Sequence, residues 1–269
     1  MTEKSKICVQ YIVLVIASII SIFPLVWMMI AATNRTVDII AGKLTFGEEL
    51  LTNYHNLISN QDIFRGFMNS VKYSVLQTLV SILICSLAGY GFEVYHDKVK
   101  DTLMALILMS MMIPFVALMI PLFRMFSSVG LLNSTLGFIL PSLSTPFLIM
   151  LFRSAARSFP GEMIEAARID GLSEFGIFFR MFVPTMRSTF AAALTVTFMN
   201  AWNNYIWPKV IMQDSKAQTL PMMISNLTSG YFTDYGALML AVLITTLPTA
   251  ILFLSLQKNF AEGITGTVK

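Results

Sequence analysis

The chain has 269 residues, of which 56% are hydrophobic and only 12% are charged, and its mean hydropathy is +0.72. This composition excludes an ordinary soluble domain and indicates an integral membrane protein. The formal net charge is only +3, and no basic run with interleaved aromatic residues occurs, so the sequence does not favour a nucleic-acid-binding protein.

Six stretches are long and apolar enough to cross a membrane, because each offers about 18 or more residues free of charge. A helix satisfies its own backbone hydrogen bonds in lipid, so repeated runs of this length predict an all-α, polytopic bundle of six transmembrane helices. The six stretches are residues 7–34, 73–92, 102–123, 125–152, 188–208 and 235–257.

The first stretch has a second interpretation. Lys4 and Lys6 precede an apolar run, as they would in a secretory signal peptide. The run exceeds the roughly 7–15 residues of a signal-peptide core, and no A-x-A cleavage site follows it. We therefore expect an uncleaved spanning helix.

The basic residues set the expected orientation. If both termini are cytoplasmic, eleven basic residues lie inside and seven outside, which is the bias that membrane insertion favours. The inner set is Lys4, Lys6, Lys98, Lys100, Arg153, Arg157, Arg168, Arg180, Arg187, Lys258 and Lys269, and the outer set is Arg35, Lys43, Arg65, Lys72, Arg124, Lys209 and Lys216.

Two polar segments are expected outside the cell, 35–72 after the first span and 213–234 before the last. The first reads as a solvated connection with a surface helix around 50–58, and the second as a loop with a short surface helix. Between them, Pro114, Pro121, Pro141 and Pro146 predict kinks in the third and fourth spans, because proline frees a backbone carbonyl. Such kinks suit a pathway that opens alternately, although proline is also common in membrane helices that only pack.

The segment 153–184 is too charged for lipid. Each of seven ionisable side chains would cost roughly 3 kcal/mol at a bilayer centre, about 20 kcal/mol together, so the segment lies outside the hydrocarbon. These side chains are Arg157, Glu162, Glu165, Arg168, Asp170, Glu174 and Arg180.

Local chemistry predicts two short helices here, joined at a glycine. Pro160 suits the first helical position, Glu162 favours the positive end of the helix dipole, and Gly171 can end the helix in a left-handed conformation. A second helix, with an apolar stripe, is expected to end near Pro184; the stripe is Leu172, Phe175, Phe179 and Phe182. A compact charged hairpin on a membrane protein indicates a docking surface.

The fifth span contains the best candidates for contact with a substrate, within 200–208. Asparagine amides can bond hydroxyls and aromatic rings can stack on C–H faces, a combination that suits a sugar. Helical spacing would place Asn200, Asn203, Asn204 and Trp207 on one side. An interfacial aromatic belt and asparagines that only join helices are the alternatives. The substrate-pathway candidates are Asn200, Trp202, Asn203, Asn204 and Trp207.

The sequence offers no metal, redox or nucleotide site. Cys8 and Cys85 lack CxxC spacing, and His55 and His96 stand alone. No GxxxxGK[ST] motif occurs, so ATP binding by a P-loop is not expected. We expect no cofactor in this chain.

The hairpin resembles the cytoplasmic EAA loop of permease subunits of ABC importers. Glu165-Ala166-Ala167, Gly171 and a Met-Phe-Val-Pro sequence ending at Pro184 carry the pattern, with Met181 and Val183 where the family usually has Ile and Leu. Flanking sequences resemble the carbohydrate-uptake, maltose-permease-like branch, over about 69–266. They are Ile113-Pro114, Ile120-Pro121-Leu122-Phe123, Gly130-Leu131-Leu132-Asn133, Ile139-Leu140-Pro141, Ala201-Trp202-Asn203-Asn204, Trp207-Pro208, Thr219-Leu220-Pro221 and Thr246-Leu247-Pro248.

This resemblance implies a type I ABC importer permease fold in a bacterial inner (plasma) membrane. It implies a second, non-identical permease subunit, a dimer of ATPase subunits holding ATP and Mg²⁺, and an extracytoplasmic solute-binding protein. The chain would then be a single permease domain, 1–269, whose loop 154–185 couples to the ATPase; its tail after residue 257 could rest against that ATPase. The coupling residues would be Glu165, Ala166, Ala167, Arg168, Asp170, Gly171 and Pro184.

The same resemblance gives the outer loops a role. In the family the loop 213–234 reaches into the binding protein, with contacts expected at Asp214, Ser215, Lys216 and Gln218, and segment 35–72 helps to meet it. The implied function is ATP-driven uptake of a mono- or oligosaccharide, with glycerol 3-phosphate or another polyol as the alternative cargo. A stand-alone secondary transporter is disfavoured because no span carries an ionisable residue near its middle, and an enzyme because no catalytic groups converge.

Overall fold

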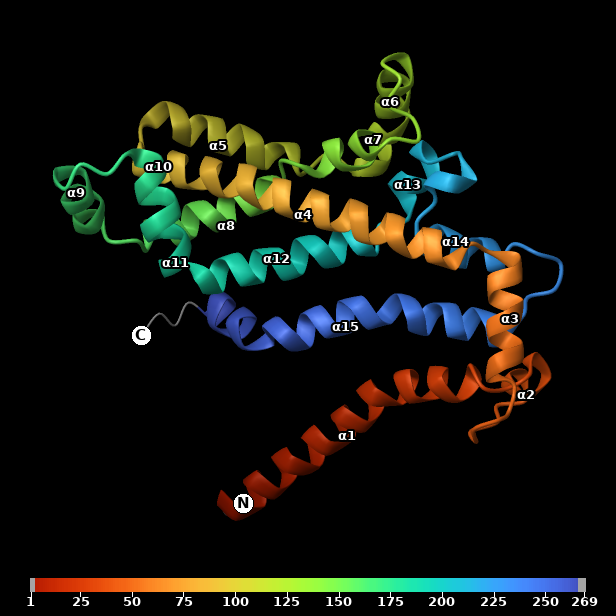
Figure 1. Ribbon diagram of the computed structural model, residues 1–269. Helices are drawn as coiled ribbons and strands as arrows, with labels where there is room; N and C mark the ends of the chain where they lie inside the picture. Colours follow the sequence, from red (N-terminus) through yellow and green to blue (C-terminus); the bar gives the residue numbers. More distant parts are fainter. Residues whose placement is uncertain (1–2, 266–269) are drawn as a thin grey trace. The chain divides into compact units, whose positions relative to one another are not determined.

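The computed structural model describes residues 3–265, except for the side chains of residues 3–5 and 258–265, so the predicted positions of Lys4, Lys258 and Lys269 lie outside the described side chains. All regular elements in this part are helical, and it contains no strand (Figure 1). The predicted all-α fold is confirmed.

The chain divides into two compact units. Unit 1 comprises Met1–Arg65 and Leu220–Pro248, and unit 2 comprises Gly66–Thr219 and Thr249–Lys269. Two long helices, α4 and α15, continue from one unit into the other.

Unit 1 contains four helices and the first part of α15. They are α1 (Glu3–Ala31), α2 (Thr36–Ile40), α3 (Leu50–Asn60), α14 (Leu220–Leu227) and α15 (Tyr235–Thr265). The surface helix expected around 50–58 is α3, which buries Asn53 and Leu57. The side chains of α1 are largely exposed and apolar along Lys6–Ala31, as expected of a helix that contacts lipid.

One buried amide holds unit 1 together. The Asn53 Nδ2 atom donates to the backbone oxygens of Ala32, at 2.9 Å, and Asn34, at 3.1 Å. Gly236, at the start of α15, lies so close that a Cβ there would be 2.4 Å from Asn53 Oδ1. The end of α1, α3 and the start of α15 therefore meet at this amide.

Unit 2 holds the remaining helices. Its framework is α4 (Ile63–Val94), α5 (Lys98–Ser110), α8 (Pro146–Arg157) and α12 (Arg187–Trp202), whose apolar core includes Cys85, Met104, Ile149, Phe152 and Ala193. The shorter elements are α6 (Phe115–Ser128), α7 (Thr135–Ile139), η1 (Leu140–Ser142), α9 (Gly161–Ile169), α10 (Glu174–Ile177), η2 (Phe178–Phe182), α11 (Val183–Thr185), α13 (Ile206–Ile211) and η3 (Ser215–Ala217).

Helices α4 and α8 approach each other at a glycine. A Cβ on Gly89 would lie 2.7 Å from the backbone N of Arg153, the backbone O of Ile149 and Cβ of Phe152. Small residues permit such close contact between membrane helices. Beside it, Arg153 Nε lies 3.0 Å from Glu93 Oε2 and its Nη2 lies 2.5 Å from Asp101 Oδ1, so an ion-pair network joins α8 to α4 and α5.

The predicted count of six spans is not reached by length and apolarity within the described residues. Three helices qualify, Lys6–Ala31, Ile63–Val94 and Tyr235–Gln257, and two bent pairs would raise the count to five. The pairs are Lys98–Ser110 with Phe115–Ser128, bent by 95°, and Thr135–Ser142 with Pro146–Arg157, bent by 55°.

Two of the four prolines predicted to kink the spans, Pro114 and Pro146, lie at the bends, whereas Pro121 lies inside α6 and Pro141 lies within η1. Pro114 precedes α6 and Pro146 begins α8, and neither can donate a helical hydrogen bond. The expected span 125–152 is not one helix, because α6 ends at Ser128 and Gly130 and Asn133 adopt positive φ angles of 72° and 55°. The fifth expected span, 188–208, is divided into α12, of only 16 residues, and α13.

Candidate functional site

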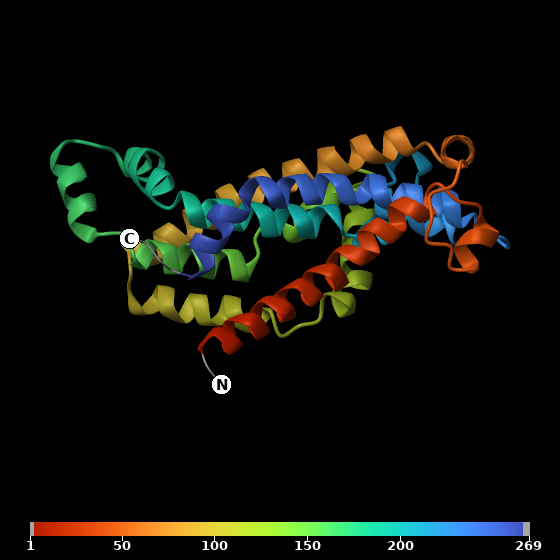
Figure 2. The same ribbon diagram turned by 90° about the horizontal axis from the view of Figure 1, so that it is seen from below.

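A helical hairpin formed by α9, α10, η2 and α11 extends beyond the ends of α4, α8 and α12 within unit 2 (Figures 1 and 2). Pro160 caps α9, just before the position expected for it. The helix ends at the predicted glycine: Gly171 has φ +80°, and Leu172 N–H donates to the Ala167 oxygen at 3.0 Å, as in a Schellman motif.

The hairpin is fixed to the membrane helices by an apolar core. Ile164 and Ala167 of α9 pack in one cluster with Phe178 and Phe182 of the second arm. Tyr90 of α4 joins this cluster, its ring centroid 4.9 Å from that of Phe182. The hairpin is therefore joined to the helix ends by a shared apolar core, and close packing of such cores limits their relative movement.

An ion pair closes the hairpin on its polar side. Arg168 Nε lies 2.7 Å from Glu174 Oε1, which ties the end of α9 to the start of α10, and the guanidinium lies 6.0 Å from the centre of the Tyr95 ring. The hydrogen bond from Arg168 holds the pKa of the Glu174 carboxyl below its ordinary value and raises that of the guanidinium. Both groups are therefore charged at neutral pH.

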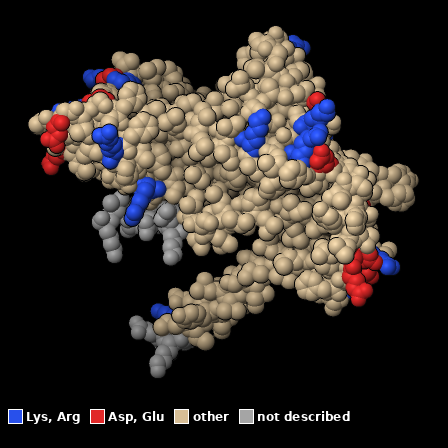
Figure 3. Space-filling view, in the orientation of Figure 1, with Lys and Arg blue, Asp and Glu red and all other residues tan. Residues whose placement is uncertain are grey.

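The opposite face of α9 is uncovered. Glu165, Ala166 and Asp170 are exposed, and Ile169 is 86% exposed although it lies in a polar segment. Acidic and basic side chains gather around the hairpin on the face shown in Figure 3. An exposed surface with a large aliphatic side chain and flanking charges suits docking to another protein.

Within the predicted set, Ala167 differs from the other coupling residues because it is buried in the hairpin core, whereas Arg168, Gly171 and Pro184 are exposed. The predicted apolar stripe is partly wrong. Phe175 and Phe179 are exposed, and Ile177, Phe178 and Phe182 form the buried side. The π-helical turn η2 rotates the side chains relative to an α-helix, which the sequence spacing does not reveal.

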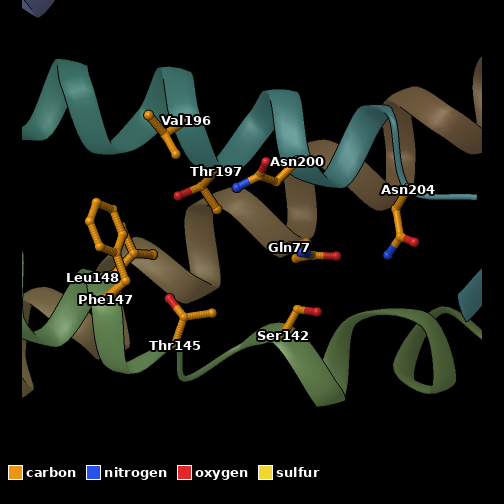
Figure 4. Close-up of a pocket in the computed structure, with 9 residues that line it drawn as sticks. All are labelled: Gln77, Ser142, Thr145, Phe147, Leu148, Val196, Thr197, Asn200 and Asn204. Atoms are coloured by element: carbon orange, nitrogen blue, oxygen red, sulfur yellow. The ribbon is translucent and has the colours of Figure 1, made fainter. Parts of the chain in front are cut away.

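A polar cavity of about 460 Å³ lies in unit 2 between α4, α12 and the break between η1 and α8 (Figure 4). Two of the predicted substrate-pathway residues line it: Asn200 from α12, and Asn204 from the turn that follows α12. The full lining is Gln77, Ser142, Thr145, Phe147, Leu148, Val196, Thr197, Asn200 and Asn204.

The other three predicted residues do not line this cavity. Asn203 is exposed, and Trp202 and Trp207 are each only 1% exposed. Trp202 packs on Phe67 and Phe198, and Trp207 Nε1 donates to the Gly137 oxygen at 3.0 Å. The two tryptophans therefore serve packing.

The expected single helical side through 200–207 does not exist either. Helix α12 ends at Trp202 and α13 begins at Ile206, so the intervening asparagines lie in a turn. Asn favours helix ends because its side chain competes for backbone hydrogen bonds.

Sequence reasoning missed the α4 wall of the cavity. Ser74, Gln77, Thr78 and Ser81 are buried on one side of this apolar helix, in register with Ser70. Polar residues recurring at i, i+4, i+7, i+8 and i+11 within a span are the signal that could have revealed it.

The residues predicted to contact a binding protein form a short surface turn. Asp214 caps η3, its Oδ1 accepting from Lys216 N at 2.8 Å, and Asn69 Nδ2 donates to the oxygens of Lys216 and Gln218, both at 2.9 Å. Asp214, Ser215 and Lys216 are exposed, whereas Gln218 is half-buried. Among the described residues, no group of three or more His, Cys, Asp or Glu side chains could hold a metal ion.

The chain is similar to a family of transport proteins and to two sugar transport permeases. Residues 81–266 match the family described as "Binding-protein-dependent transport system inner membrane component". The chain is 44% identical to the lactose transport system permease protein LacG of Rhizobium radiobacter, over 97% of this chain and 96% of that protein. It is 32% identical to the arabinooligosaccharides transport system permease protein AraQ of Bacillus subtilis, over 94% and 92% respectively.

The fold is also shared with a solved structure. A chain from the crystal structure of a bacterial ABC transporter involved in the import of the acidic polysaccharide alginate superimposes with a TM-score of 0.82, at 18% identity, covering 97% of this chain and 99% of that one. This likeness establishes the architecture of an ABC importer permease.

Proposed function

Because the chain belongs to the family of binding-protein-dependent transport system inner membrane components, we propose that it is one permease subunit of an ATP-driven sugar importer. The observation that carries this proposal is the α9–α11 hairpin, which is packed rigidly against the ends of α4, α8 and α12 and leaves one face of α9 uncovered. The chain itself is a transport subunit and not an enzyme.

The hairpin couples the chain to a cytoplasmic ATPase. Ile169 and the charges of Glu165 and Asp170 enter a cleft on one subunit of an ATPase dimer, which holds ATP and Mg²⁺; this chain carries no cofactor. Closure of the dimer displaces the hairpin, and the shared apolar core transmits the displacement to the membrane helices.

The remaining partners follow from this arrangement. A second, non-identical permease completes the translocation pathway, and an extracytoplasmic solute-binding protein delivers the sugar to segments 35–72 and 213–234. The exposed turn at Asp214, Ser215 and Lys216 is one contact for that protein, with Gln218 at its edge. Both termini and the loop 154–185 then lie in the cytoplasm, and the chain crosses the bacterial inner membrane several times.

The proposed cargo is a mono- or oligosaccharide. The lactose and arabinooligosaccharide permeases are 44% and 32% identical to the chain, whereas the sn-glycerol-3-phosphate permease UgpE of Escherichia coli is 27% identical. A polyol phosphate is therefore the second candidate. Asn200 on α12 and Asn204 in the turn after it line the cavity, whereas Trp202 and Trp207 are buried away from it and Asn203 is exposed.

The proposed coupling of the hairpin to an ATPase can be tested with a substitution at Gly171. Gly171→Asp adds a charge at the exposed turn, where no atom lies within 4 Å of the new Cβ. Gly130→Asp is the matched control, because Gly130 has φ +72° and equally open surroundings but lies outside both the hairpin and the segments 35–72 and 213–234. Both variants carry a similar backbone cost, roughly 1–2 kcal/mol.

In proteoliposomes containing the complete transporter, Gly171→Asp should retain ATP hydrolysis but lose uptake by roughly tenfold, as for about 1.4 kcal/mol of lost docking free energy. Gly130→Asp should transport normally, and Glu165→Lys should behave like Gly171→Asp. Normal uptake by Gly171→Asp, or an equal loss in Gly130→Asp, would contradict the proposed role. Purification without an associated ATPase would instead favour a secondary transporter.

A further inference from the structure

A separate pocket of unit 2 lies where α4 meets the base of the hairpin. Its volume is about 350 Å³, and it shares no residue with the polar cavity between α4, α12 and α8. Its lining is mainly apolar and aromatic, and consists of Leu87, Tyr90, Gly91, Tyr95, Glu174, Phe175 and Phe178.

Two polar atoms of this lining have no hydrogen-bond partner. The Tyr90 hydroxyl is buried and unpartnered, in a residue that is only 4% exposed. Glu174 Oε1 accepts from Arg168 at 2.7 Å, but Glu174 Oε2 is buried and unpartnered. The Arg168 guanidinium, and then the Tyr95 hydroxyl, lower the pKa of this carboxyl, so it is charged. Because a carboxylate can only accept, two such atoms in one pocket indicate a ligand that donates hydrogen bonds.

The pocket continues into a second one on the same side of α4. The second pocket has a volume of about 400 Å³, shares Leu87, Gly91 and Tyr95 with the first, and adds Lys100 from α5. No atom lies within 4 Å of a Cβ built on Gly91, so this glycine leaves open the space that both pockets share. We call the two pockets together the α4 groove; the other residues of the second pocket are Ala88, Phe92 and Leu103.

An exposed apolar row on α4 leads into the groove. Leu79 and Leu83 are 57% and 45% exposed, and Leu87 and Gly91 follow at the same spacing of four residues, which keeps them near one side of the helix. From Leu79 to Gly91 the helix rises about 18 Å, close to the roughly 15 Å of one leaflet of a bilayer. The row therefore has the length and the apolar character that suit an acyl chain.

The charges at the end of the groove define the head group. The Glu174 carboxylate favours a cation with N–H donors and disfavours an anion. Lys100, which also pairs with Asp97, has three N–H donors and suits a phosphate. A quaternary ammonium has no N–H and would leave Glu174 Oε2 unpartnered. A primary ammonium and a phosphate on one apolar molecule satisfy both ends.

We propose that the α4 groove binds one phospholipid with a primary-amine head group, from the leaflet beside the hairpin. Its ammonium donates to Glu174 Oε2 and the Tyr90 hydroxyl, Lys100 donates to its phosphate, and an acyl chain lies over Gly91. Because Tyr90 also belongs to the core that joins the hairpin to α4, the bound lipid stabilises the base of the hairpin. This proposal goes beyond the proposed function and needs neither sugar nor ATP.

The test compares variants inside and outside the groove. Tyr90→Phe removes the unpartnered hydroxyl and keeps the ring; Tyr73→Phe on the same helix is its control, because Tyr73 is also 4% exposed but does not line the groove. Gly91→Leu fills the groove, whereas Ala105→Leu adds bulk at an exposed position of α5 outside it. Glu174→Gln removes the charge that attracts the amine.

The assay is native mass spectrometry of the complete purified transporter, titrated with dioleoyl phosphatidylethanolamine and its mono-, di- and trimethylated forms. Affinity should fall along this series, by roughly tenfold for the trimethylated lipid, which has no N–H. Tyr90→Phe should weaken binding of the unmethylated lipid roughly fivefold, and Glu174→Gln and Gly91→Leu roughly tenfold, while both controls bind as the wild type does. Glycerophosphoethanolamine, the head group without acyl chains, should not compete.

A stability measurement separates lost binding from misfolding. In detergent without added lipid, Tyr90→Phe should keep or raise the thermal midpoint, because it removes a buried hydroxyl that has no partner. Added phosphatidylethanolamine should then raise the midpoint of the wild type and of Tyr73→Phe more than that of Tyr90→Phe.

Several results would overturn the proposal. One is equal wild-type affinity for the unmethylated and trimethylated lipids, and another is an unchanged preference in Tyr90→Phe, Glu174→Gln and Gly91→Leu. Preferred binding of dioleoyl phosphatidylglycerol would show that basic residues hold an anionic lipid instead. Loss of the second permease, rather than of lipid, from Gly91→Leu would show that a protein covers the groove. All of these results leave the proposed function intact, because transport and association with an ATPase are measured separately.

Discussion

The close approach of α4 and α8 makes Gly89 the position where one methyl group has the clearest predicted effect. In Gly89→Ala the new Cβ would lie 2.7 Å from two backbone atoms of α8 and from Phe152 Cβ, all on a helix that cannot rotate away as a flexible side chain could. Overpacking of this kind costs roughly 1–3 kcal/mol. The matched control is Gly91→Ala on the same helix, where no atom lies within 4 Å of the new Cβ.

The two variants share one favourable effect, because alanine is about 0.8–1.0 kcal/mol better than glycine inside a helix. Gly91→Ala should therefore be neutral or slightly stabilising, and the difference between the variants should equal the overpacking cost. For a chain of this size, a difference of 1–3 kcal/mol corresponds to roughly 3–10 °C in thermal midpoint. Thermal unfolding of the purified transporter in detergent measures it, and equal midpoints for the two variants would refute the packing argument.

Two further predictions concern the hairpin and unit 1. Because the folded-state pKa of Glu174 lies below its unfolded value, its pair with Arg168 stabilises fully at neutral pH and is lost on acidification. Below about pH 5 the thermal midpoint should thus fall slightly more steeply in the wild type than in Glu174→Gln, and parallel curves would contradict this. In unit 1, Gly236→Ala should displace the Asn53 amide and cost roughly 1–3 kcal/mol, but nothing further in an Asn53→Ala background, as a double-mutant cycle of thermal unfolding would show.

The hairpin could be predicted from the sequence because its signals are local. A proline before α9, a glycine at its end and seven ionisable side chains in an otherwise apolar chain are each readable within a few residues. The orientation of the side chains in the second arm of the hairpin could not be predicted. A π-helical turn there changes which phenylalanines are buried, and this depends on how Phe178 and Phe182 pack against Tyr90 of α4.

Only some of the residues that line the cavity could be predicted, because the others are brought together by the fold. Asn200 and Asn204 are conspicuous in a span, but Gln77, Thr145 and Thr197 are ordinary polar residues until the fold brings three distant segments together. The same asparagines also carried a second meaning. They mark the end of α12, whereas the sequence interpretation considered them as ligand contacts or as residues that join helices, and so extended the helix by several residues.

The helices that carry the hairpin also form walls of the cavity. On α4, Tyr90 packs in the hairpin core and Gln77 lines the cavity, thirteen residues away, or about 20 Å along a helix. On α12, Phe190 packs against the hairpin core and Thr197 lines the cavity, seven residues apart, or about 10 Å. On α8, Ala155 packs in the hairpin core and Leu148 lines the cavity, also seven residues apart. Of the lining, only Ser142 and Thr145 lie before Pro146, at the break in the helix. If an ATPase displaces the hairpin, as proposed above, we expect continuous helices to carry the displacement to the cavity and the interrupted segment to yield, which would alter the distances among the lining groups.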